Sequence, residues 1–106
     1  MMAACDREIA LEFKRRAEEL APILQFYVFG SRARGDATAG SDLDVFLVMG
    51  HLDAGLREKI SEVAWEVGFD NGLVLSTFVV TAEQLEHGPL GVSPIVRQIE
   101  KEGVPL

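Results

Sequence analysis

The sequence FGSRARG at residues 29–35, followed after a short polar segment by SDLDVFLV at residues 41–48, organises the rest of the chain. The second part reads as a strand, in which alternate side chains share a face, so Asp42 and Asp44 are expected to point the same way. Two like charges held close together repel each other, and burial strengthens the repulsion. A divalent cation removes this conflict, because Mg²⁺ takes oxygen ligands, commonly one or two carboxylates with waters and substrate phosphates.

The first part predicts a place for phosphate groups. Residues 23–29 read as a strand, after which Gly30 and Ser31 turn into a short helix over residues 31–36. Glycine lets a backbone approach phosphate closely, and the free amides at a helix start attract anions. Ser31 is expected to cap this helix or to give its hydroxyl to a phosphate oxygen. Gly35 is expected to let the chain leave the helix.

Two arginines, Arg32 and Arg34, lie inside this short helix. Each could make a charge-assisted contact with a phosphate group. Salt bridges to Asp36 or Asp42 are an equally supported use for them, so both roles stay open at this point.

The spacing of the two parts resembles a known signature. Gly30-Ser31, ten intervening residues and Asp42-x-Asp44 look like the motif of the DNA polymerase beta-like nucleotidyltransferase superfamily. The fuller GSRARG and SDLD segments are similar to its minimal nucleotidyltransferase branch. The resemblance implies that Gly30 and Ser31 hold a nucleoside triphosphate and that Asp42 and Asp44 are catalytic ligands of Mg²⁺. Because two half-motifs agree in content and spacing, the signal is more specific than a lone glycine-rich loop. An isolated Asp-x-Asp would instead read as the exposed start of a strand.

The third predicted strand, residues 73–80, departs from the family pattern. Full members of the superfamily carry a third carboxylate on a later strand, whereas this segment contains no acid. Ser76 is the residue expected at the corresponding place, and Asp70 lies just before the strand. The resemblance therefore leaves two functions open, an active transferase and a nucleotide-binding module that acts by occluding its partner.

The remaining elements predict a small mixed β-sheet with helices packed on it, an α/β (α+β) nucleotidyltransferase fold. A first helix is expected to be capped by Asp6 and to bury residues at helical spacing, namely Ile9, Phe13, Ala17 and Leu20. A second long helix is expected to begin after Asp53 and to stop at Gly68. A capping box at Thr81 opens a short helix, and a last helix follows Ser93-Pro94 with Ile95, Val96 and Ile99 facing inward.

Composition places limits on the class of protein. The 106 residues are expected to form one domain, 1–106, and a net charge of −7 argues against non-specific nucleic-acid binding. One cysteine, Cys5, allows no disulfide framework within the chain and favours a cytoplasmic setting. No apolar run is long enough for a membrane span. Trp65 lies off the buried stripe of its helix, so it either flanks the core or marks a subunit contact in a homo-oligomer.

The resemblance also implies an acceptor and a partner. Family members of this build transfer AMP from ATP to a hydroxyl, and are often paired with a small helical protein of the HEPN class. In such toxin–antitoxin pairs the nucleotidyltransferase is the antitoxin. For this chain we therefore expect Mg²⁺, ATP or another nucleoside triphosphate, and a HEPN-type protein as cofactor, substrate and partner.

Overall fold

The computed structural model describes residues 1–106 as a four-stranded sheet between helices. In chain order the elements are α1 (Ala4–Glu18), β1 (Ile23–Phe29), α2 (Gly30–Arg34), β2 (Leu43–Met49), α3 (Ala54–Asn71), β3 (Leu75–Thr81), α4 (Ala82–His87), the 3₁₀ helix η1 (Pro89–Val92), α5 (Pro94–Glu102) and β4 (Val104–Pro105). None of the helices is both long and apolar enough to span a bilayer.

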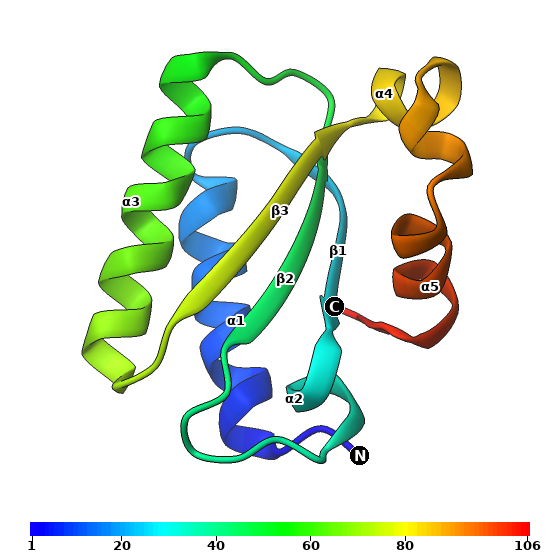
Figure 1. Ribbon diagram of the computed structural model, residues 1–106. Coiled ribbons are helices and arrows are strands. Elements are labelled where there is room, and N and C mark those ends of the chain that lie inside the picture. The colour runs from blue at the N-terminus through cyan, green and yellow to red at the C-terminus, as the bar shows by residue number, and fades with distance from the viewer.

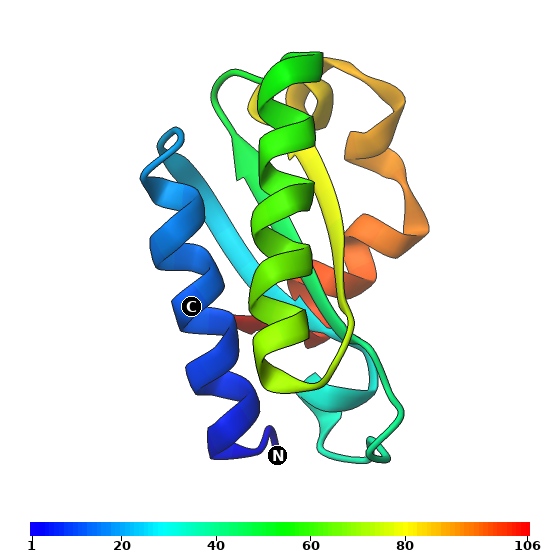
Figure 2. The ribbon, with the colours of Figure 1, turned by 90° about the vertical axis from the view of Figure 1, so that its left-hand side faces the viewer.

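The sheet has the order β3-β2-β1-β4 and is mixed, which confirms the predicted architecture. Strand β1 pairs antiparallel with both β2 and β4, whereas β2 and β3 are parallel. Helices α1 and α3 cover one face of the sheet, and α4 and α5 lie on the other (Figure 1). Turning the molecule shows α1 and α3 side by side across the sheet (Figure 2). The short helix α2 lies beyond the end of β1, outside both layers.

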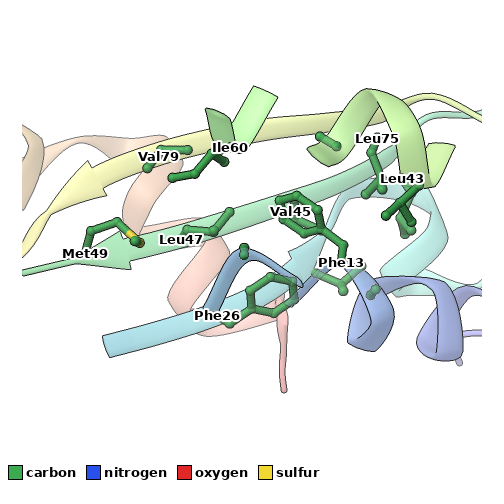
Figure 3. Packing of buried hydrophobic residues seen from close by; sticks show 14 of the residues in the cluster. Phe13, Phe26, Leu43, Val45, Leu47, Met49, Ile60, Leu75 and Val79 are labelled. Atoms are coloured by element: carbon green, nitrogen blue, oxygen red, sulfur yellow. The ribbon is translucent and has the colours of Figure 1, made fainter. Parts of the chain in front are cut away.

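Strand β2 is central and covered on both faces, as its apolar pattern predicted. On one face its side chains pack under α1 and α3, where Leu43, Val45 and Leu47 belong to the same buried cluster as Phe13 of α1 (Figure 3). On the other face Phe46 and Val48 are buried in a smaller cluster with residues of α5. Because the faces alternate, Asp44 lies on the α5 side, together with Phe46.

Helix α1 differs from its prediction at the N-terminus. Asp6 does not cap the helix, because the helix begins at Ala4 and Asp6 is buried inside its first turn. Phe13 and Ala17 are buried as expected, whereas Ile9 is only half-buried and Leu20 lies beyond the helix and is exposed. The buried face therefore runs from Asp6 through Ala10 rather than through Ile9, and it places a carboxylate in the interior.

Helix α3 also differs from its prediction, at its C-terminus. Asp53 caps the helix as expected, its carboxylate accepting a hydrogen bond from the Leu56 amide. The helix does not stop at Gly68 but continues to Asn71 and ends at Gly72, whose φ is +70°. Gly68 is needed for another reason, since a Cβ there would lie 2.6 Å from the Leu73 carbonyl oxygen. Gly68 therefore serves close packing and does not end the helix.

One aromatic residue and two C-terminal helices complete the comparison. Trp65 is 67% exposed and stacks on Phe69, so it does not flank the core, while its role as a subunit contact stays a prediction. The capping box of α4 is present. In α5, Val96 and Ile99 are buried, but Ile95 is half-exposed rather than inward.

Candidate active site

The turn at Gly30 and the carboxylate of Asp44 lie against each other. The antiparallel register of β1 and β2 pairs Phe29 with Asp44, so the next residue, Gly30, lies close to the acid. A Cβ on Gly30 would lie 2.5 Å from Oδ2 of Asp44, and the φ of Gly30 is +77°. Glycine is therefore required for two reasons: the backbone is left-handed here, and a side chain would clash with Asp44. The structure brings the two halves of the sequence motif into one small volume.

Asp42 and Asp44 are not neutralised by any basic residue. Asp44 is half-buried near the start of β2, whereas Asp42 is exposed and lies just before the strand rather than in it. Burial, and secondarily the charge of Asp42, raise the pKa of the Asp44 carboxyl above its usual value. Because the chain itself provides no cation, this electrostatic cost stays uncompensated.

Ser76 lies beside Asp44 in the sheet. The parallel register of β2 and β3 pairs the two residues directly, and its equivalence to the third carboxylate of the family stays a prediction. Asp70 is exposed near the C-terminal end of α3, on the helix layer that covers the opposite face of the sheet (Figure 1). No group of three or more His, Cys, Asp or Glu side chains is placed to hold a metal ion. The carboxylate set is therefore the pair Asp42 and Asp44.

Ser31 does not cap α2, which corrects the first of its two predicted roles. The residue before the helix is Phe29, and no side chain caps the helix. The Ser31 carbonyl accepts hydrogen bonds from the amides of Gly35 and Asp36, at 3.0 and 3.1 Å, and so closes the helix. Gly35 ends it with a φ of +83°, as predicted. The Ser31 hydroxyl makes no hydrogen bond to another residue of the chain and is free for a ligand.

The two arginines, Arg32 and Arg34, form salt bridges with different partners. Arg34 is half-exposed and pairs with Asp36 at 3.3 Å, one of the two salt bridges expected for it. Arg32 pairs with neither Asp36 nor Asp42. Its side chain is only 11% exposed, and Nη1 donates to Asp6 Oδ1 at 2.8 Å. The structure therefore does not place Arg32 with Gly30 and Ser31 as a free phosphate contact.

The partnership of Asp6 and Arg32 was missed in the sequence, although one signal for it exists. Asp6 continues the helical spacing of the buried residues Ala10, Phe13 and Ala17 toward the N-terminus. An acid on the apolar stripe of a helix is expected to need a cationic partner, since a buried charge is costly when unpaired.

A small open cavity of about 150 Å³ adjoins the Gly30 turn. One wall comes from Phe29, Gly30 and Arg34. The other wall comes from residues along the length of α5 and just after it, namely Ile95, Gln98, Ile99, Glu102 and Gly103. Gln98 donates to Glu102 at 3.2 Å within this wall. Sequence reasoning gave α5 only a packing role, because no motif marks its residues as part of the site.

The two carboxylates of the site suit a hard cation that takes only part of its ligands from the protein. Two carboxylates are the usual protein contribution to Mg²⁺, which keeps waters and binds substrate phosphates at its other positions. Burial, and secondarily the charge of Asp42, raise the pKa of Asp44, and a bound cation would oppose both effects. Asp42 and Asp44 therefore fit one shared metal site, whose further ligands would come from solvent and nucleotide.

Comparisons with known proteins bear on the fold and the family of the chain. A Sulfolobus solfataricus protein described as a putative nucleotidyltransferase has a similar structure, with a TM-score of 0.52 and 24% identity over 73% of this chain and 68% of its own. A mutant of the toxin–antitoxin complex MntA-HpeT gives a TM-score of 0.60 and 17% identity over 94% of this chain and 70% of its own. No match was found among curated protein sequences.

At these identities the two structures establish the fold alone. The family model described as a nucleotidyltransferase domain matches residues 7–104 and so includes both halves of the motif and α5. With the mixed sheet and the approach of Gly30 to Asp44 already established, we conclude that this chain belongs to the nucleotidyltransferase domain family.

Proposed function

We propose that this protein transfers a nucleoside monophosphate, AMP from ATP in the simplest case, to a hydroxyl group of a partner protein in a Mg²⁺-dependent reaction. The observation that carries the proposal is the approach of Gly30 to the Asp44 carboxylate, which puts a glycine turn beside an acid that has no cationic partner. Family membership supports transferase activity in general.

Each residue of the site has a proposed role. Asp42 and Asp44 hold Mg²⁺, which when bound would offset charge on the phosphates and lower the pKa of an attacking hydroxyl. The Gly30 backbone and the free Ser31 hydroxyl bind phosphate oxygens, and Arg34 can leave Asp36 to join them. The acceptor oxygen attacks the α-phosphorus, the bond to the bridging oxygen breaks, and pyrophosphate leaves. The acceptor proton passes to solvent or to the partner, because Ser76 is not a base.

A protein is the acceptor favoured here. The cavity of about 150 Å³ between the Gly30 turn and α5 is too small to enclose both a nucleotide and a second substrate. The structural likeness to a toxin–antitoxin complex supports a partner toxin, and the sequence resemblance points to a small helical HEPN protein. In this proposal the chain is the antitoxin and silences the toxin by modifying it.

The second candidate is a nucleotide-binding module that occludes its partner without transfer. The specific observation in its favour is Ser76, which faces Asp44 where a third carboxylate would complete the acid set. In that case the metal and nucleotide would still bind between Gly30 and Asp44.

Transfer of label separates the two candidates. The protein would be incubated with Mg²⁺, the product of the neighbouring gene, and ATP labelled at either the α- or the γ-phosphate. Label from α-ATP on the partner, with none from γ-ATP, supports nucleotidyl transfer. Complex formation and ATP binding without label on the partner would establish the occluding module. Label from γ-ATP would show phosphoryl transfer and contradict the proposal.

A further inference from the structure

Arg32 ties three parts of the chain together beside the proposed metal site. Its Nη1 donates to Asp6 of α1 at 2.8 Å, and its Nε donates to the Ser41 carbonyl oxygen at 2.9 Å. Its Nη2 lies 3.4 Å from the carbonyl oxygen of Ala39. The side chains of Arg32 and Asp6 are only 11% and 7% exposed. The planar guanidinium thus joins α1 to the loop that leads into β2.

The loop has its own internal structure, which Arg32 fastens to the rest of the molecule. The Thr38 amide donates to the Ser41 hydroxyl at 3.0 Å, and the Ser41 amide donates back to the Thr38 carbonyl at 3.0 Å. These bonds make the segment 38–41 a closed turn. They do not connect it to any helix or strand, and the bond from Arg32 to Ser41 supplies that connection.

Asp42 lies between two fixed points of the backbone. The preceding carbonyl, of Ser41, is held by Arg32, and the following amide, of Leu43, donates to the Val74 carbonyl at 2.8 Å. The Asp42 side chain itself is exposed and has no partner within the chain. Its place relative to Asp44 is therefore set by its backbone, and one of the two backbone anchors is Arg32.

We infer that Arg32, held by Asp6, is a positioning residue that fixes Asp42 for metal binding and does not itself contact the nucleotide. The inference rests on the proposed function, because it concerns the metal site of the same reaction. Its physical basis is that residues which orient a ligand commonly change metal affinity by about tenfold or more when replaced, although they do not touch the metal.

Two variants separate positioning from stability. Arg32→Lys keeps a positive charge for Asp6 but loses the planar fork that reaches Asp6 and Ser41 together. The double variant Asp6→Leu with Arg32→Met replaces the buried pair by apolar side chains, an exchange that is often neutral for stability, and removes the tie altogether. Arg15→Lys is the matched control, because Arg15 forms an exposed pair with Glu19.

Two readouts are taken without nucleotide or turnover. Mn²⁺ binding is measured by electron paramagnetic resonance, and hydrogen exchange is measured at the amides of residues 39–43. We expect both Arg32 variants to bind Mn²⁺ about tenfold more weakly and to exchange faster in this segment, with Arg15→Lys like the wild type. The double variant should show both effects while its melting temperature stays near that of the wild type. A purely structural role of Arg32 would instead lower the melting temperature together with Mn²⁺ binding.

The outcomes distinguish this inference from the proposed function. Unchanged exchange at residues 39–43 in Arg32→Lys and in the double variant would overturn the positioning role, whatever the metal does. Faster exchange with unchanged Mn²⁺ affinity would overturn it too, because the loop would then be irrelevant to the site. A wild-type protein that binds no Mn²⁺ would instead refute the metal assignment of Asp42 and Asp44.

Discussion

Two carboxylates beside the short helix α2 show opposite solutions to one problem. Asp6 is buried and receives the guanidinium of Arg32, so its charge is balanced within the chain. Asp44 is half-buried and lies against the Gly30 turn. The charged group that acts on it is another acid, Asp42. The first arrangement fixes structure, whereas the second leaves a negative charge for something outside the chain to neutralise. The difference separates an acid that stabilises the fold, Asp6, from an acid that is available to bind a cation, Asp44.

The largest expected effect follows from removing the acids that lack a partner. The double variant Asp42→Asn with Asp44→Asn keeps the shape of the site and removes both charges that would hold Mg²⁺. We expect it to reduce Mg²⁺-dependent transfer of label to the partner below detection, because each charge is a proposed metal ligand. Activity that survives in this variant would mean that the metal lies elsewhere.

A smaller effect, on stability, follows from removing the acid that has a partner. Asp6→Ala leaves a buried guanidinium unpaired, which should lower the free energy of unfolding by about 3 kcal/mol in urea denaturation. The matched control is Asp36→Ala, which breaks the exposed pair with Arg34 and should cost less than about 1 kcal/mol. Equal losses in the two variants would show that Asp6 and Arg32 are not a distinct structural pair.

Two glycines test whether the site requires the close approach of Gly30. Gly30 and Gly72 both have positive φ, but a Cβ on Gly72 meets no atom within 4 Å. Gly72→Ala should therefore cost about 1–2 kcal/mol from backbone strain alone and leave Mn²⁺ binding unchanged. Gly30→Ala should cost more and should also weaken Mn²⁺ binding, because its methyl group displaces Asp44. Normal Mn²⁺ affinity in Gly30→Ala would separate the turn from the acid.

The smallest effect concerns pH. Since the pKa of Asp44 is raised in the folded state, the unfolded chain loses its proton first, and stability falls as pH rises through the folded pKa. Asp44→Asn should therefore be slightly more stable than the wild type at pH 7, by a fraction of a kcal/mol after solvent screening. The advantage should vanish near pH 4 and shrink when Mg²⁺ is added. Asp70→Asn, an exposed acid, serves as the control, and a less stable Asp44→Asn protein at pH 7 would contradict the assignment.

Features that depend on neighbours in the chain could be predicted from the sequence. The strand at 23–29, the cap at Asp53 and the capping box at Thr81 each follow from a few adjacent residues. The strand that contains Ser76 could also be predicted, and the register places Ser76 beside Asp44.

Features that depend on distant contacts could not be predicted in the same way. Asp6 resembles a helix cap locally, and its place on the buried stripe is explained by its contact with Arg32, 26 residues away. Gly68 resembles a helix stop until the Leu73 carbonyl is seen to pack against it. Ile95 fits the inward pattern of α5 but lines the open cavity beside Gly30 and is half-exposed.

A crystal structure with Mn²⁺ and a non-hydrolysable ATP analogue would examine the convergence of Gly30 with the two acids. We expect the anomalous signal of the metal about 2.2 Å from carboxylate oxygens of both Asp42 and Asp44, with the triphosphate against the Gly30 and Ser31 backbone on the α5 side of the sheet. Metal bound away from these acids, or a triphosphate on the face covered by α1 and α3, would contradict the proposed site.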